Sequence, residues 1–201
     1  MKTTVFLLIL NLSSHAAFIW ARFVVFRIDG CTPRGTRLIE VSAAISLLAG
    51  AALIACREET YFFIDILAGL LSLFSMVLFG WGIRTVRRRR LTAAFCDDLP
   101  VELIDVGPFR YVRNPFYLSY ILIYAQCVLA SWSGWALVPF FWMAAIYVRA
   151  ALLEEKKFLR SQFGEAYHKY MEETGRFVPN LFPKGGLLWG LKSAASRTRP
   201  N

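Results

Sequence analysis

Five apolar runs constrain the fold of this chain more than any other feature of its sequence. A helix that crosses a bilayer needs about 20 consecutive, predominantly apolar residues, because lipid offers no partner to an unpaired backbone group. The runs approach or exceed that length, and they cover residues 5–26, 38–56, 61–83, 116–130 and 135–153. The sequence therefore predicts an all-α fold, a multi-pass membrane helix bundle of about five transmembrane helices.

Composition supports an integral membrane protein and argues against several other classes. Hydrophobic residues make up 57% of the 201 residues, whereas apolar residues, glycine included, reach about 45 to 50% in a soluble domain. The net charge is +9, but the basic residues lie between the apolar runs without a nucleic-acid motif, so we expect no nucleic-acid partner. Four widely spaced cysteines and two histidines predict neither a disulfide framework nor a metal site.

The distribution of basic residues predicts how the helices are oriented. The link at residues 57–60 is so short that the second and third runs are expected to form an antiparallel hairpin. The loops after the first and third runs carry ten Lys and Arg, three in 27–37 and seven in 84–115, and the other side has Lys2 and Arg57. Because cytoplasmic loops are enriched in Lys and Arg, we predict that the N-terminus lies outside and the C-terminus in the cytoplasm.

The last third of the chain is predicted to be ordered beyond the fifth run. Residues 154–173 lack proline and place aromatic side chains at helical spacing, which predicts a C-terminal amphipathic cytoplasmic helix near the lipid headgroups. The fifth run is expected either to continue into this helix or to hinge onto it. Pro179 and Pro183 end this helix, and residues 184–201 are expected to fray. No internal repeat or long linker divides the chain, so residues 1–201 are predicted to form one domain.

Two polar residues within the runs allow alternative interpretations. Asp65 lies one turn into the third run, and we expect it at the membrane interface, although a functional intramembrane carboxylate is the alternative. His15 interrupts the first run, and we expect it to pack against other helices rather than to bind a ligand.

A compact motif at residues 107–117, G-P-F-R-Y-V-R-N-P-F-Y, opens the fourth run. Asn114 and Pro115 are typical of an N-cap followed by proline at the first helical position. A helix N-terminus favours an anion, and Arg110 and Arg113 add two cations nearby. The motif therefore predicts an anion-binding site at the membrane surface. The alternative is a basic flank that only sets topology.

A second polar cluster, Arg149, Glu154 and Glu155, lies where the fifth run ends. The uncharged link at residues 131–134 makes the fourth and fifth runs a hairpin, so the cluster and the motif should be neighbours. A solvated helix end is the alternative interpretation. At a bilayer boundary, the mixture of charges favours a ligand that is both anion and cation, such as a sulfonium cofactor with an amino acid end.

The motif and the stretch that follows some thirty residues later, R-A-A-L-L-E-E-K-K-F-L-R-S-Q-F-G-E-A-Y-H-K-Y-M-E-E-T-G-R-F-V-P, resemble the isoprenylcysteine carboxyl methyltransferase and phospholipid methyltransferase superfamily. The resemblance covers about residues 101–183. It implies a membrane-embedded methyltransferase with this region as its catalytic part. It also implies an S-adenosylmethionine site at the cytoplasmic membrane face, without a Rossmann domain. The sequence has no G-x-G-x-x-G, in agreement with that implication.

The resemblance assigns roles by position along these motifs. Glu154 or Glu155 is implied to close the cofactor pocket from the side opposite the first motif. The predicted cofactor-binding residues are Gly107, Tyr111, Arg113, Asn114, Pro115, Tyr117 and Glu155, and the predicted catalytic residues are Arg149 and Glu154.

Three positions depart from the superfamily pattern. Asn114 stands where a histidine is usual, so it can cap the helix and hydrogen-bond a ligand but cannot titrate. Val101 stands where a second histidine is frequent, which removes another cofactor contact. The Glu154-Glu155 pair lies one residue further from F-G than expected, and Arg149 two residues further. Each residue adds about 100° of helical phase, so the direction in which these side chains face stays open.

The acceptor decides which residue matters most for methyl transfer. An in-line displacement needs mainly positioning and removal of water. A bidentate Arg149 would orient a carboxylate acceptor, whereas Glu154 would hold an ammonium and help remove its proton. We predict carboxyl O-methylation of an isoprenylcysteine-like substrate whose tail enters laterally between the spans. Phospholipid N-methylation of the phosphatidylethanolamine type is the near alternative.

Two other classes also stay open at this point. A sterol-reductase-like enzyme is similar in its C-terminal part and would need a nicotinamide cofactor. A non-enzymatic membrane scaffold would bind neither that cofactor nor S-adenosylmethionine.

Overall fold

The structure, a computed structural model, describes residues 2–24, 34–87, 100 and 102–180. In this part of the chain there is no β-strand, so the all-α prediction is confirmed. Most of the basic loop at 27–37, the run Arg88–Arg90, Val101, and Pro183 with the tail after it lie outside the described residues. The helices are α1 (Lys2–Val24), α2 (Arg34–Ala55), α3 (Phe62–Val86), α4 (Pro115–Ser131), α5 (Leu137–Arg160) and α6 (Gly164–Glu173), with the 3₁₀ turns η1 (Gly107–Arg110) and η2 (Gly134–Ala136).

The helices confirm a multi-pass membrane protein. Among the described residues, α1, α2, α3 and α5 are long and apolar enough to cross a membrane, and α4 is a shorter apolar helix of 17 residues. Large apolar side chains cover the outside of the bundle: Leu48 is 70% exposed, Phe63 83% and Trp135 77%. Such a surface suits lipid rather than water. That α4 also spans the membrane stays a prediction.

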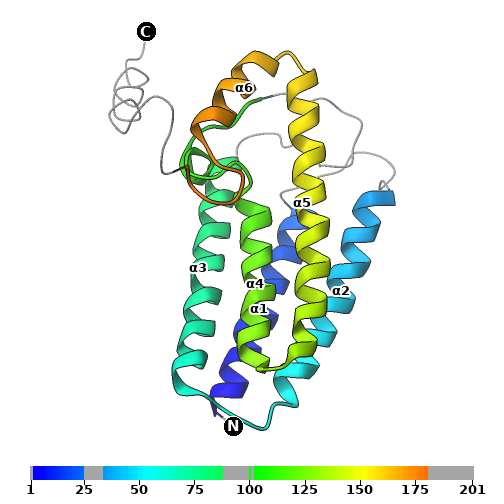
Figure 1. Cartoon of the computed structure of the whole chain (residues 1–201), viewed down its shortest axis with the longest axis vertical. Helices are drawn as coiled ribbons and strands as arrows, with labels where there is room; N and C mark the ends of the chain where they lie inside the picture. The colour runs from blue at the N-terminus through cyan, green and yellow to red at the C-terminus, as the bar shows by residue number, and fades with distance from the viewer. Residues whose placement is uncertain (1, 25–33, 88–99, 101, 181–201) are drawn as a thin grey trace.

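The five long helices lie side by side, and α6 packs across one end of the bundle, the α6 end (Figure 1). The N-terminus and the short α2–α3 and α4–α5 connections lie at the other end. Helix α4 is central, because it contacts α1, α2, α3 and α5. Helices α3 and α4 approach closely where a small residue lies between them. A Cβ on Gly82 of α3 would lie 2.8 Å from the Phe116 ring of α4, so glycine leaves room for that ring.

A buried ion pair ties the helices together at the end opposite α6. Arg57 donates to both carboxylate oxygens of Asp65 at 2.6 and 2.7 Å, and to the Ala130 carbonyl at 2.7 Å. It also donates to the Thr4 hydroxyl at 3.2 Å. The Arg57 and Asp65 side chains are 3% and 7% exposed. Asp65 is therefore shielded by packing and neutralised by Arg57, and its position at the membrane interface stays a prediction.

The predicted helix at 154–173 is divided between two elements. Helix α5 continues seven residues past the predicted end of the fifth run, so Glu154 and Glu155 lie within it. It ends where Ser161 turns to extended backbone and its hydroxyl accepts from the Phe163 amide at 3.2 Å. A Cβ on Gly164 would lie 2.7 Å from the Leu159 carbonyl, so glycine permits the sharp bend into α6.

Candidate active site

The segment before α4 is held against α3 by a glycine. Gly107 has φ +64, in the left-handed region that glycine adopts readily. A Cβ there would lie 2.3 Å from the Thr85 hydroxyl, so no other residue fits without displacing α3. Pro108 follows within η1 and is fully buried. Gly107 therefore positions the motif.

The motif is also tied to the segment after α6. The Arg113 amide donates to the Gly175 carbonyl at 2.8 Å, and the Asn114 amide donates to the Arg176 carbonyl at 3.2 Å. The Tyr170 hydroxyl donates to the Phe109 carbonyl. Two stretches some sixty residues apart thus form one layer across the α6 end of the bundle.

Charged side chains beneath this layer form a closed cluster of Arg113, Glu155 and Arg176. Arg113 Nη2 lies 3.2 Å from Glu155 Oε1, and Arg176 Nη2 lies 2.8 Å from Glu155 Oε2. Arg113 also donates to the Met171 carbonyl at 3.2 Å and to the Thr174 carbonyl. The hydrogen bond from Arg176 to Glu155 raises the pKa of the guanidinium. The cluster thus binds α5 to both ends of the layer and keeps one net positive charge.

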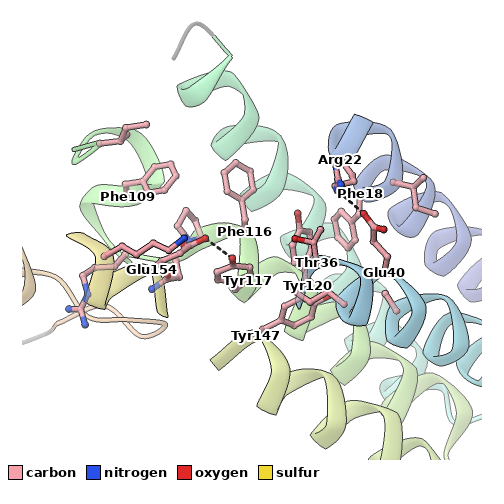
Figure 2. A pocket seen from close by; sticks show the side chains of 18 of the residues that line it. Phe18, Arg22, Thr36, Glu40, Phe109, Phe116, Tyr117, Tyr120, Tyr147 and Glu154 are labelled. Atoms are coloured by element: carbon pink, nitrogen blue, oxygen red, sulfur yellow. Dashed lines mark hydrogen bonds and ion pairs between the residues drawn. The ribbon is translucent and has the colours of Figure 1, made fainter. Parts of the chain in front are cut away.

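A cavity of about 630 Å³ opens beside this cluster, at the α6 end of the bundle (Figure 2). We call the portion lined by α5, α6 and residues 100–116 the α6 part, and the portion lined by α1 and α2 the α1–α2 part. The side chains between the two parts are tyrosines on α4 and α5. Those tyrosines are Tyr117, Tyr120, Tyr124 and Tyr147.

The tyrosines hold a carboxylate at the centre of the cavity. The Tyr117 hydroxyl donates to Glu154 Oε1 at 2.7 Å (Figure 2). Tyr117 stacks on Tyr147 with ring centroids 5.7 Å apart, and Tyr147 lies 5.2 Å from Tyr120. Glu154 is half-buried and lines the cavity. The arrangement can bind a cation or accept a proton in an environment with little water.

Asn114 stands at the predicted N-cap position, but its side chain makes no capping hydrogen bond. The residue is 7% exposed and lines the cavity, and its Nδ2 has no hydrogen-bond partner within the described structure. An unpaired buried donor costs about 1 to 3 kcal/mol. A ligand with an oxygen or ring-nitrogen acceptor would remove that cost, so the amide fits a polar cofactor in the α6 part.

The structure brings together five of the nine predicted site residues in the cavity lining: Arg113, Asn114, Pro115, Tyr117 and Glu154. Glu155 lies behind them in the charged cluster, and Gly107 packs on α3. Tyr111 is 53% exposed, with its ring 5.8 Å from that of Trp81. Arg149 is exposed. It stands five residues from Glu154, about 140° around α5, and is not part of the lining.

The resemblance implies that the C-terminal helix forms part of the cofactor site, but sequence reasoning named none of its aromatic residues as ligand contacts. Phe158 stacks on Tyr167 with ring centroids 4.6 Å apart and an angle of 10° between the ring planes. Burial raises the pKa of both Tyr167 and Tyr170, so their hydroxyls stay protonated. The helical spacing of these aromatic residues was visible in the sequence, but it predicted contact with headgroups rather than a cavity wall.

The α1–α2 part was missed entirely, because no local motif marks it. It includes His15, Arg22, Thr36 and Glu40, together with apolar side chains. His15 is 5% exposed, and its Nδ1 donates to the Asn11 carbonyl at 2.9 Å. It thus packs among helices as predicted, but it also faces the cavity. Among the described residues, no three His, Cys, Asp or Glu side chains gather as a metal site would require.

Comparison with known proteins gives one positive result. A sequence profile described as phospholipid methyltransferase matches residues 63–166, more than half of the 201-residue chain. The match begins in α3 and ends in α6, so it includes α4, α5 and the four cavity tyrosines on those two helices. Helices α1 and α2 lie outside it. A search of curated proteins finds no match to this chain.

Proposed function

The chain belongs to the phospholipid methyltransferase family, and from that premise we propose that it transfers a methyl group from S-adenosylmethionine to the amine of a phospholipid. The family supports a membrane methyltransferase. The choice of an amine acceptor rests on one observation, the Glu154 carboxylate that Tyr117 holds in the cavity at 2.7 Å. We further propose that the α6 end of the bundle faces the cytoplasm, as the loop charges predict.

The α6 part is the proposed cofactor site. When bound, S-adenosylmethionine supplies the methyl group of a sulfonium, whose sulfur keeps the bonding electron pair as the methyl passes to the acceptor nitrogen. The unpaired Asn114 amide would donate to an acceptor atom of this cofactor. The net positive charge of the Arg113 cluster suits its carboxylate. The stacked Phe158 and Tyr167 rings offer an apolar surface for its adenine.

Glu154 is the proposed catalytic base. A phospholipid ammonium has no lone pair, so it must lose a proton before its nitrogen can attack a methyl group. A half-buried carboxylate attracts the ammonium and accepts that proton. The hydrogen bond from Tyr117 fixes the direction of the carboxylate. The tyrosine rings exclude water that would otherwise solvate the amine.

Carboxyl methylation of an isoprenylcysteine-like substrate is the second candidate. The sequence argument for it used Arg149, which is exposed and does not line the cavity. Lys157 does line the cavity and carries the charge that a carboxylate acceptor needs. In this alternative, Lys157 would take the positioning role that the sequence assigned to Arg149.

Transfer of labelled methyl groups by the purified full chain tests the proposal. We expect label in the headgroup of phosphatidylethanolamine, and a loss of at least about a hundredfold in Glu154→Gln, in line with the contribution of general-base catalysis. Glu165→Gln, an exposed glutamate on α6, is the matched control and should retain full transfer. Label in the base-labile ester of a prenylcysteine analogue would favour the second candidate instead. Full transfer by Glu154→Gln would exclude Glu154 as the base.

A further inference from the structure

An ion pair lies at the edge of the α1–α2 part of the cavity. Arg22 Nε lies 2.8 Å from Glu40 Oε1, and the two side chains are 25% and 41% exposed (Figure 2). Arg22 stands near the end of α1, and Glu40 stands two turns into α2. Thr36, one turn before Glu40, is 9% exposed and lines the same cavity. The charged side chains of this pair therefore lie beside the cavity and are accessible from it.

The wall that continues from this pair is apolar. Helix α1 runs toward the α6 end and α2 runs away from it (Figure 1). Residues before Arg22 and after Glu40 therefore lie deeper in the bundle. Apart from His15, the cavity lining at those positions is apolar: Phe18, Ile19, Ala43, Ala44, Leu47 and Leu48. The Arg22–Glu40 pair and the apolar wall beside it suit a single lipid molecule. Its headgroup would lie at the pair, and its acyl chains would lie between α1 and α2.

The pair also lies level with the methyl-transfer residues. Ala21, next to Arg22, packs in one cluster with Phe116, next to Tyr117 on α4. Tyr117 in turn holds Glu154. The cavity thus has a cation, Arg22, on its α1 side and a carboxylate, Glu154, on its α5 side. A zwitterionic headgroup carries the two complementary charges, a phosphate for the arginine and an amine for the carboxylate.

We propose that Arg22 binds the phosphate of the acceptor phospholipid, which displaces Glu40, while the acyl chains lie along the apolar wall between α1 and α2. This inference rests on the proposed function, because it assumes that the acceptor is a phospholipid. Glu40 accepts a hydrogen bond from Arg22 Nε, so it competes with the phosphate. Arg22 and Glu40 are then specificity-determining residues in two helices outside the family match.

Binding of phosphatidylethanolamine to the full chain loaded with S-adenosylhomocysteine, measured by native mass spectrometry, tests the inference. Arg22→Gln should weaken lipid binding about ten- to a hundredfold, the range for a hydrogen bond to a charged group. Glu40→Gln should strengthen it, because the competing carboxylate is gone. Arg37→Gln, an exposed arginine on α2, is the control and should leave binding unchanged. If both members of the pair change binding in the same direction, or neither does, the pair is only a tether between helices and the inference fails.

Three probes separate the possible ligands of Arg22. Phosphatidylethanolamine should respond to Arg22→Gln, and diacylglycerol, which lacks the phosphate, should not. A prenylcysteine analogue that responds in place of phosphatidylethanolamine would overturn the phosphate assignment.

The binding assay requires no turnover, so the two proposals can fail separately. Lipid binding that depends on Arg22 without methyl transfer would support this inference and refute the proposed function. Transfer to phosphatidylethanolamine with an unchanged KM in Arg22→Gln would support the proposed function and refute this inference.

Discussion

Neutralising Glu155 should destabilise the protein, whereas neutralising its neighbour Glu154 should not. Glu155 is the only acid that the structure shows bound to Arg113, which is 7% exposed, and it also binds Arg176, which is 35% exposed. Breaking a buried ion pair costs about 3 to 5 kcal/mol, because the remaining charge is left uncompensated. Arg176 can be hydrated, and Arg113 keeps two carbonyl partners. We therefore expect about 3 kcal/mol for Glu155→Gln, the lower end of that range.

Thermal unfolding of the detergent-purified protein measures this difference. A loss of 1 kcal/mol lowers Tm by about 2 to 4 °C in a chain of this size, so about 3 kcal/mol corresponds to about 6 to 12 °C. In Glu154→Gln the amide oxygen still accepts from Tyr117. The cost there should be about 1 kcal/mol or less, although transfer is lost.

The two variants thus separate a structural carboxylate from a catalytic one, since each makes the same chemical change at adjacent positions. Equal losses of Tm in the two variants would refute the division of roles. So would a Glu155→Gln variant as stable as the native chain. Transfer by Glu155→Gln should be measured well below its Tm, so that loss of fold does not imitate loss of chemistry.

Two further predictions concern the cofactor and the far end of the bundle. Asn114→Ala should weaken S-adenosylhomocysteine binding about two- to tenfold by calorimetry, the value of one neutral hydrogen bond; unchanged binding would exclude the amide as a contact. Arg57→Gln should lower stability by about 3 to 5 kcal/mol, because it leaves Asp65 buried and unpaired, and the double variant with Asp65→Asn should recover most of that loss. A double variant as unstable as the single one would refute the ion pair as the cause.

The helices were predictable because their signal is local. A run of about 20 apolar residues in lipid has few alternatives to a helix, so α1, α2, α3 and α5 were found with ends shifted by a few residues. The break between α5 and α6 was harder to predict from the sequence. It depends on Ser161 turning the backbone and on Gly164 fitting against Leu159, and a single glycine weakens a helix without fixing where it ends.

The site was predictable where a local motif or the α4–α5 hairpin brings its residues together. Asn114, Pro115 and Tyr117 open α4 and line the cavity, as a polar motif at the start of an apolar helix suggests. Arg22 and Glu40 lie in helices without any motif, and they meet the cavity only because α1 and α2 pack against α4. Such a wall follows from tertiary packing, which no single segment encodes.

Helical phase explains why the polar residues expected to form one ligand site divide into two groups. Glu154 and Glu155 are adjacent, and one residue turns the side chain by about 100° around α5. Glu154 therefore faces Tyr117 and the cavity, and Glu155 faces Arg113 and Arg176. The same rotation carries Arg149 to the exposed side of the helix. Glu155 neutralises Arg113 and joins α5 to the segments before α4 and after α6 through two ion pairs. The neighbouring Glu154 carboxylate lines the cavity, where the proposed function requires it to meet the acceptor.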